Sequence, residues 1–312
     1  MNTLLSGREY WFKKTHKKEK SGTKLAQKLK ASQNWRTDMK KVIIDFDCTI
    51  NVRGCDLDDA FACLYLLSSK DVDVKMITTS FGNSNEDKVY ESSKKMIEDL
   101  NIDVPLYKGG IFSLDAATHI RDLVNTEDDI IILSLGSTTN TQRALTLGMD
   151  PARVKSLVLM GGITSELQFK GRVMNELNFS IDHLSTNYVF SKIKNINIIT
   201  GNNCMAHRYL VPENPKYKSS YMNYMKDSLI RWTKEFDIIY QERELVLWDA
   251  LAALYITNPE FFEDKKRSIE LKENMARGFL KEGNDAIVNL PELVTDIDAM
   301  EYIINVIEEG GR

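Results

Sequence analysis

Short apolar runs alternate along this chain with segments of helical periodicity, and this alternation limits the possible folds more than any other feature of the sequence. VIIDFD, DIIILSLG and VKSLVLMGG are rich in β-branched residues and short, so each predicts a buried strand. DDAFACLYLLSS and DKVYESSKKMIEDL predict helices between such strands. Strands that alternate with helices of ~10–15 residues indicate a parallel sheet with helices on both faces. The predicted fold class is therefore α/β, a doubly wound and mostly parallel sheet.

The composition of the chain changes near residue 38. Residues 1–38 are rich in lysine and are predicted to form a basic N-terminal arm, either solvated or docked on a partner. The aromatic residues of this arm favour docking, because solvated tails rarely carry them. Residues 39–312 are predicted to form a single α/β domain that is mostly helical after Asn203.

Net charge and cysteine usage exclude several classes of protein. A net charge of -4 points to no nucleic-acid or membrane partner for the domain. No stretch approaches the ~20 consecutive apolar residues of a transmembrane helix. The four cysteines show no CxxC spacing, and a chain of 312 residues has no need of a disulfide framework. We therefore expect reduced thiols and a cytoplasmic location.

Five aspartates crowd the stretch VIIDFDCTINVRGCDLDDAF. Asp45 and Asp47 end the first predicted strand, and Asp56, Asp58 and Asp59 precede the first predicted helix. Capping of that helix and interaction with its dipole can explain one or two of the last three. Neither effect explains two carboxylates at the end of a buried strand. The cluster therefore indicates metal binding or catalysis.

Polar groups follow several other predicted strands, and parallel strands bring such groups to one edge of the sheet, where ligands bind. A group of carboxylates at that edge is costly unless a cation neutralises it. Because the acidic stretch contains oxygen ligands and no histidine, it favours a hard ion such as Ca²⁺ or Mg²⁺ over zinc. Asn83 follows the second predicted strand, Leu135 begins the Leu-Gly-Ser segment that ends the fourth, and Glu176 and Asn178 lie in the connection after the fifth.

Two families have a similar first strand. IIDFDCTI matches the D-x-D-x-T motif of the haloacid dehalogenase-like phosphatases, in which the first Asp attacks a phosphate and the second acts beside Mg²⁺. That family also requires an acidic pair late in the chain, after another strand. Here the second acidic group follows almost immediately, before any second strand.

The second family is that of the nucleoside hydrolases, whose opening has a variant ending in G-T-D-x-D-D-A. GCDLDDA at residues 54–60 resembles it closely. SFGN, LSLGSTTN, LVLMGG, NELNFSID and LWDALAALYITNPEFF then resemble further family motifs in the same order. The resemblance covers residues 42–307 and implies a nucleoside hydrolase-like fold. Several motifs in order are far more specific than one D-x-D.

The resemblance implies a Ca²⁺ site formed by the side chains of Asp47, Asp59 and Asp249 and by the backbone carbonyl of Leu135. Asp47 would also accept a proton from a water bound to the ion, and that water would attack the anomeric carbon of a ribosyl substrate. Asp45 would support Asp47 without contacting the ion.

On the substrate side, the resemblance implies that four positions hold the ribose hydroxyls: Asp58, Asn83, Glu176 and Asn178. Trp248 stands where many family members have a His that is a candidate acid for the leaving base. An indole cannot supply a usable proton, but it can stack on a base. The metal and ribose side therefore looks retained, whereas the leaving-group side looks rebuilt.

Two loops also depart from the family pattern. CTINVR takes the place of a single residue between Asp47 and Gly54, and residues 109–115 are shorter than the usual active-site loop. The leading hypothesis is calcium-dependent hydrolysis of the N-glycosidic bond of a ribonucleoside or related small ribosyl compound. The alternatives are a non-catalytic protein that binds a ribosyl ligand and a Mg²⁺-dependent phosphatase. The family resemblance implies a homodimer or homotetramer.

Overall fold

The computed structural model describes residues 39–294 and 297–311. Contacts along the chain separate Met1–Met39 from Lys40–Arg312, and the fold below is that of the second unit. The basic arm predicted for residues 1–38 lies outside the described residues. In the described part of the chain, no helix is long and apolar enough to cross a membrane.

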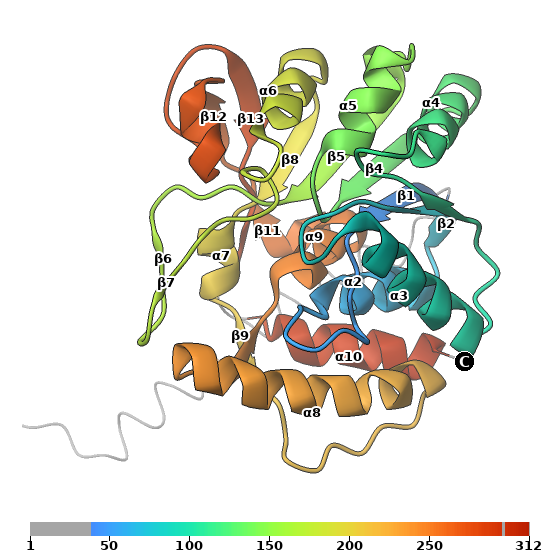
Figure 1. Cartoon of the computed structure of the whole chain (residues 1–312), viewed down its shortest axis with the longest axis vertical. Coiled ribbons are helices and arrows are strands. Elements are labelled where there is room, and N and C mark those ends of the chain that lie inside the picture. Colours follow the sequence, from blue (N-terminus) through green and yellow to red (C-terminus); the bar gives the residue numbers. More distant parts are fainter. Residues whose placement is uncertain (1–38, 295–296, 312) are drawn as a thin grey trace, which may run out of the picture. The chain divides into compact units, whose positions relative to one another are not determined.

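An eight-stranded sheet forms the centre of the unit (Figure 1). All neighbouring strands are parallel except the pair β12–β13 at one edge. This arrangement confirms the predicted doubly wound, mostly parallel α/β fold. In sheet order the strands are β12 (Lys266–Ile269), β13 (Ala286–Asn289), β8 (Ile196–Ile199), β5 (Val154–Met160), β4 (Ile130–Ser134), β1 (Lys40–Phe46), β2 (Val72–Thr79) and β3 (Leu106–Lys108).

Helices cover both faces of this sheet. In Figure 1, α4 (Asp115–Thr126), α5 (Thr139–Thr146) and α6 (His183–Lys192) lie together on one face. On the other face, α2 (Asp58–Ser68) packs against α9 (Trp248–Thr257), and α10 (Ala299–Gly310) packs against both. The remaining helices are α3 (Glu86–Asp99), which contacts β2 and β3, the short α7 (Gly201–Met205), and α8 (Ser220–Tyr240), which contacts α10.

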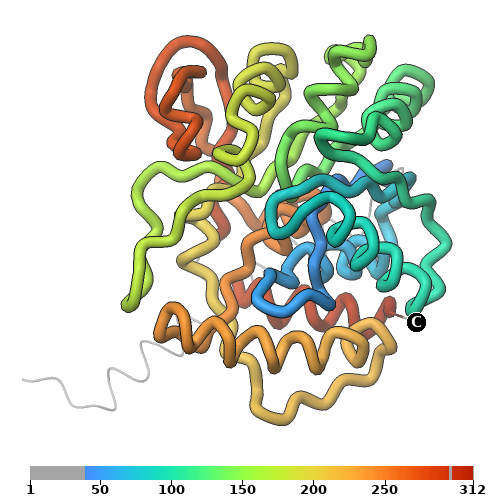
Figure 2. Tube along the Cα trace, viewed as in Figure 1, coloured from blue at the N-terminus to red at the C-terminus, as the bar shows by residue number. Residues whose placement is uncertain are grey.

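Three pairs of short strands lie outside the central sheet. They are the hairpin β6 (Leu167–Gln168) and β7 (Val173–Met174), the pair β9 (Arg208–Leu210) and β10 (Glu244–Val246), and the pair β11 (Phe262–Glu263) and β14 (Glu292–Leu293). The trace in Figure 2 shows how the loops around these pairs connect the sheet to α7, α8 and α9. All four cysteines are free, in line with the expectation of reduced thiols.

The part of the chain after Asn203 contains more strand than its sequence pattern predicted. β12 and β13 extend the main sheet, although neither shows a continuous apolar run. Three of the four residues of β12 are exposed, because it is an edge strand that packs on little else. A short exposed edge strand carries too few apolar side chains for periodicity to reveal it.

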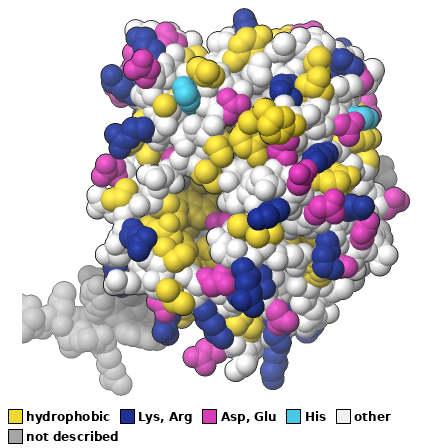
Figure 3. Space-filling model, viewed as in Figure 1, with side chains coloured by type: hydrophobic (Ala, Val, Ile, Leu, Met, Phe, Trp, Pro, Cys, Tyr) yellow, Lys and Arg dark blue, Asp and Glu magenta, His cyan; other side chains and the backbone are white. Residues whose placement is uncertain are grey.

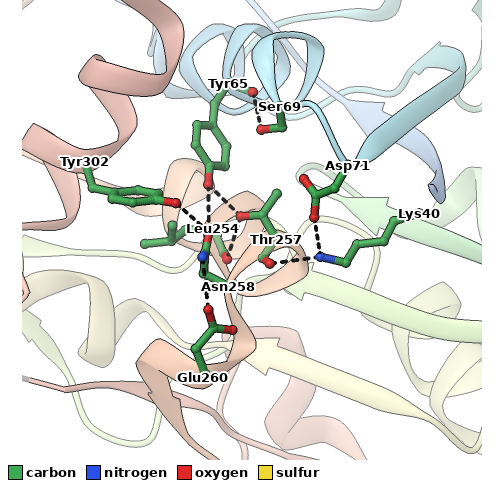
Figure 4. Close-up of polar contacts among 9 residues, drawn as sticks. All are labelled: Lys40, Tyr65, Ser69, Asp71, Leu254, Thr257, Asn258, Glu260 and Tyr302. Atoms are coloured by element: carbon green, nitrogen blue, oxygen red, sulfur yellow. Dashed lines mark hydrogen bonds and ion pairs between the residues drawn. The ribbon is translucent and has the colours of Figure 1, made fainter. Parts of the chain in front are cut away.

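A polar network ties the C-terminal end of α9 to its neighbours (Figure 4). The hydroxyl of Tyr65 in α2 hydrogen-bonds the hydroxyl of Thr257 at 2.5 Å, and the hydroxyl of Tyr302 in α10 donates to Asn258 Oδ1 at 3.2 Å. The ammonium of Lys40, which starts β1, donates to the carbonyl of Thr257 at 2.9 Å and to Asp71 at 2.7 Å. These bonds fix α9 relative to α2 and β1.

Because both faces of β4 are buried, the burial of its apolar side chains contributes to the free energy of unfolding. We expect Ile132→Ala, at the centre of β4, to lower the free energy of unfolding by about 2–5 kcal/mol through lost burial and a new cavity. Ile287→Ala in β13 is the matched control, because that side chain is 67% exposed. Urea unfolding of both variants tests this; equal losses would contradict the described core.

Candidate active site

The site lies at the carboxyl end of β1, where the strand order reverses. After β1 the chain builds β2 and β3 on one side of it, and then β4, β5 and β8 on the other. Such a switch point leaves a crevice at the strand ends, where open α/β sheets bind ligands. Asp47 follows β1 directly, and Leu135 follows β4, so both lie at this point.

Asp47 is buried and is held by backbone and side-chain groups from the neighbouring strand end. Its Oδ2 accepts the backbone N–H of Asn83 at 2.6 Å, and its Oδ1 accepts the side-chain amide of Asn83 at 3.2 Å. A Cβ on Gly82 would lie 2.2 Å from Asp47 Oδ2, so only glycine allows this approach. Gly136, after β4, also lies against Asp47, because a Cβ there would be 3.2 Å from the Asp47 Cβ.

Three more carboxylates converge from the N-termini of two packed helices. Asp58 and Asp59 lie in the first turn of α2, and Asp249 lies in the first turn of α9. Each offers an oxygen atom, and these atoms all lie within 4.8 Å of one another. The backbone N–H of Asp249 donates to Asp58 Oδ2 at 3.2 Å, and the backbone N–H of Asp47 donates to Asp59 Oδ1 at 3.2 Å. Helix N-termini favour this concentration of negative charge.

Asp45 lies behind Asp47, inside the sheet. Its Oδ1 accepts hydrogen bonds from the hydroxyl of Thr78 at 2.7 Å and from the side-chain amide of Asn140 at 2.8 Å. Its Oδ2 is buried and has no partner among the described residues. Burial raises the pKa of Asp45 to about 7, although the bonds from Thr78 and Asn140 act in the opposite direction.

The segment between β7 and α6 supplies the other wall of the site. Glu176 accepts the backbone N–H groups of Gly162 and Phe179 on Oε1 and that of Ser180 on Oε2. The amide of Asn178 donates to the carbonyl of Leu135 at 2.9 Å, and also to the carbonyl at the end of β5. Both side chains are therefore held by strand ends and turns.

A cavity of about 440 Å³ opens over these groups. Figure 3 shows a hollow on one face of the molecule in which hydrophobic side chains surround acidic atoms. Asp47, Asp59 and Asp45 lie beneath the cavity and do not line it. The predicted residues that line it are Asp58, Asn83, Leu135, Glu176, Asn178, Trp248 and Asp249.

Burial dominates the electrostatics of the cluster. It raises the pKa of Asp47 to about 7, and the charges of Asp56 and Asp45 add to the effect while the bond from Asn83 opposes it. Burial raises the pKa values of Asp59 and Asp249 well above their ordinary range, and neighbouring carboxylates raise them further. So many buried carboxylates can all be ionised only if a cation lies among them.

Comparison with known proteins identifies the family. The family model for inosine-uridine preferring nucleoside hydrolases matches residues 42–303. The chain belongs to this family. Nucleoside hydrolases are glycosidases that act on N-ribosyl bonds, so the prediction of an enzyme of this class is confirmed. A sequence comparison with curated proteins gave no match.

Solved structures of nucleoside hydrolases share the fold at low sequence identity. A plant nucleoside hydrolase superposes with a TM-score of 0.71 at 19% identity, over 86% of this chain and 98% of its own. A purine-preferring ribonucleoside hydrolase from Gardnerella vaginalis gives 0.69 at 18% identity, over 86% and 98%. An inosine-uridine preferring nucleoside hydrolase from Bacillus anthracis gives 0.64 at 17% identity, over 87% and 100%.

The side chains of this nucleoside hydrolase fit a divalent cation. The donors are oxygen atoms of carboxylates, which suit hard cations. The close group consists of Asp58, Asp59 and Asp249, whereas the ligand set expected from the sequence was Asp47, Asp59, Leu135 and Asp249. Asp47 lies next to this group, because its backbone N–H donates to Asp59 Oδ1 at 3.2 Å. The carbonyl of Leu135 accepts a hydrogen bond from the amide of Asn178.

Asp56 and Tyr240 line the cavity although the family resemblance assigned neither of them a role in the site. Asp56 lines the cavity beside Asp58, and its position in the acidic stretch was the available signal. Tyr240, the last residue of α8, also lines the cavity. Its part in the site depends on how α8 packs, and no motif marks it.

The raised pKa values predict how pH affects the stability of the protein without a cation. Between pH ~4 and ~7 the folded chain holds protons on Asp45 and Asp47 that the unfolded chain has lost, because the ordinary pKa of both is 3.8. The free energy of unfolding therefore falls as pH rises through this window. A cation that binds the ionised carboxylates reverses the loss, so excess Ca²⁺ should raise the melting temperature more at pH 7.5 than at pH 5.

Thermal melts with and without Ca²⁺ measure this effect. Asp249→Asn should reduce the rise at pH 7.5. Asp129→Asn, which changes a 71% exposed carboxylate at a positive-φ position that tolerates Asn, should keep it. An equal rise at both pH values would show that the buried cluster is not the binding site.

Proposed function

We propose that this chain hydrolyses the N-glycosidic bond of ribonucleosides or related ribosyl compounds and that the reaction depends on Ca²⁺. The observation that carries the proposal is the convergence of Asp58, Asp59 and Asp249 beside Asp47, at a cavity that Asp58 and Asp249 line, in a chain of this family. The reaction replaces the bond between C1′ and a base nitrogen with a bond between C1′ and the oxygen of a water.

Asp47, Asp59, Asp249 and the carbonyl of Leu135 are the proposed cation ligands, with Asp58 close enough to share the charge. When bound, Ca²⁺ would orient ribose hydroxyls and make a nearby water more acidic. The oxygen-only donor set and the number of carboxylates support calcium rather than a transition metal.

Asp47 is the proposed general base. Burial raises the pKa of Asp47 to about 7 when no cation is present, and a bound cation would keep this carboxylate ionised, which is the form that accepts a proton. The two bonds from Asn83 hold the carboxylate in one orientation, which favours proton transfer from a water in a defined place. Asp45 supports this arrangement from the sheet, where Thr78 and Asn140 hold it.

The cavity walls suit a sugar that becomes positively charged. Hydrolysis of a glycosidic bond passes through an oxocarbenium-like transition state. Carboxylate and amide oxygens that already point at the cavity stabilise such a charge without reorganising. Asp58, Asn83, Glu176 and Asn178 are the proposed partners of the ribose hydroxyls, and Trp248 is the proposed stacking surface for the base.

A second candidate function is ribosyl binding without turnover. The inserted segment after Asp47 favours this function, because contacts with α8 hold the segment beside the site. The hydroxyl of Tyr224 accepts a hydrogen bond from Asn51 at 2.9 Å, and the carboxylate of Glu235 accepts one from the backbone N–H of Gly54 at 3.0 Å. The family assignment leaves the phosphatase alternative without support. Assembly into a homodimer or homotetramer, and a cytoplasmic location, stay predictions.

Replacement of the proposed base tests the function. Asp47→Asn keeps the shape of the side chain and an oxygen for the Asn83 N–H, but it cannot accept a proton at neutral pH. We expect kcat for ribose release to fall by about 10²–10⁴-fold. A reducing-sugar assay across a nucleoside panel measures it, with Asp129→Asn as the control. Unchanged kcat would refute the role of Asp47, and ribose binding without release in the unsubstituted protein would favour the binding function.

A further inference from the structure

Among the described residues, no imidazole lines the cavity. The described histidines are His119, His183 and His207, and none lines the cavity. No lysine lines it either, and Arg172, an exposed residue between β6 and β7, is its one cationic side chain among the described residues. Carboxylates that bind a cation are ionised, and both Asp56 and Glu176 accept backbone N–H groups, which favour the ionised form of each. Among the described lining residues, this leaves the phenol of Tyr240 as a neutral proton donor. A phenol is a far weaker acid than an imidazolium.

Aromatic rings form a continuous wall beside the acidic groups. The rings of Trp232 and Phe236 in α8 stack with centroids 4.6 Å apart, and the Phe236 and Tyr240 rings are also 4.6 Å apart. Phe169, after β6, lies 5.2 Å from the Tyr240 ring and 6.4 Å from the Trp248 ring. This wall runs from α8 to the start of α9, next to Asp249.

A second cavity of about 270 Å³ adjoins the first along this wall. The two cavities share Asp56, Asn83, Met174, Leu177 and Tyr240 among their lining residues. The second cavity adds the carboxylate of Glu235 and the rings of Trp232 and Phe236, and no cationic side chain from residues 39–294 or 297–311 lines it. Aromatic faces together with carboxylates form a surface that binds flat cations.

We propose, building on the function above, that the preferred substrates of this site are ribosides whose leaving group is a cationic aromatic ring, such as N-ribosylpyridinium compounds or N7-alkylated purine ribosides. Two observations support this class of substrate: the lack of an imidazole among the described residues that line the cavity, and the aromatic wall with carboxylates beside it. A ring that is already cationic needs no proton to leave, and the wall attracts it before the reaction.

The chemistry balances without a further reactant. The bond between C1′ and the ring nitrogen breaks, and its electron pair goes to the ring, which loses its positive charge and departs neutral. The oxygen of water bonds to C1′, and the proton that the water loses goes to Asp47 and then to solvent. A neutral nucleoside would instead release an anionic base unless an acid protonated it, and no imidazolium from the described residues lines this cavity.

Three ribosides separate the contributions of charge and leaving ability. Inosine is neutral and needs an acid. 7-Methylinosine has the same ring system with a positive charge and leaves without a proton. p-Nitrophenyl β-D-riboside is neutral and also leaves without a proton. With Ca²⁺ and the full chain, we expect kcat/KM for 7-methylinosine to exceed that for inosine by at least ~100-fold, the usual contribution of an acid. We expect p-nitrophenyl riboside to be hydrolysed with a higher KM than 7-methylinosine.

Each outcome decides one question. Equal kcat/KM for inosine and 7-methylinosine would overturn the inference, while hydrolysis of p-nitrophenyl riboside would keep the proposed function intact. A KM for p-nitrophenyl riboside equal to or below that for 7-methylinosine would overturn the preference for a cation. No hydrolysis of any of the three would refute the proposed function itself.

Two variants of Trp248 test whether the lack of an acid limits the hydrolysis of neutral nucleosides. Trp248→His places an imidazole beside Asp249, and Trp248→Phe removes the same indole without adding an acid. We expect the histidine variant to exceed the phenylalanine variant in kcat/KM for inosine by about 10-fold or more, and the two to agree within about 3-fold for 7-methylinosine. If the histidine variant raises kcat/KM equally for both substrates, or for neither, then the lack of an acid is not the cause of the specificity. Melting temperatures of both variants establish that each is folded.

Discussion

The burial of several carboxylates at one strand end is the interaction on which the rest of this structure depends. Asp47, Asp58, Asp59 and Asp249 would repel one another in an apolar interior, and three of them are placed at helix N-termini that offset part of that cost. A divalent cation is the simplest group that offsets the remainder. The fold therefore keeps these side chains together in a geometry in which ionisation of the carboxyl groups costs stability unless a counter-charge is present.

That geometry requires α2 and α9 to keep a fixed position relative to each other, because α2 supplies Asp58 and Asp59 and α9 supplies Asp249. Their N-termini meet at the site, and the polar network around Thr257 joins their opposite ends to α10 and to the start of β1 (Figure 4). Gly82 contributes in another way, since any side chain there would displace Asp47. Residues far from the chemistry thus determine the distances between the carboxylates.

The two sides of the cavity come from different parts of the sequence. The stretches that resemble family motifs supply the carboxylate side. On the opposite side, Tyr224 and Glu235 of α8 hydrogen-bond the loop around the inserted segment. The aromatic side chains of α8 line the cavity there. Charge and ring stacking, rather than proton donation, are what this wall offers to a leaving group.

The sequence alone determined the alternation of strands and helices and the identity of the acidic residues, because buried parallel strands and helix starts have strong local patterns. It did not reveal β12 and β13, whose side chains are mostly exposed at the sheet edge. Only the tertiary structure decided that Asp58 joins Asp59 and Asp249, and that Asn83 and Asn178 bond the oxygens of Asp47 and Leu135. Tyr240 likewise reaches the cavity through the packing of α8. These relations join residues up to ~190 positions apart, and distances across such separations depend on how whole elements pack, which no local pattern encodes.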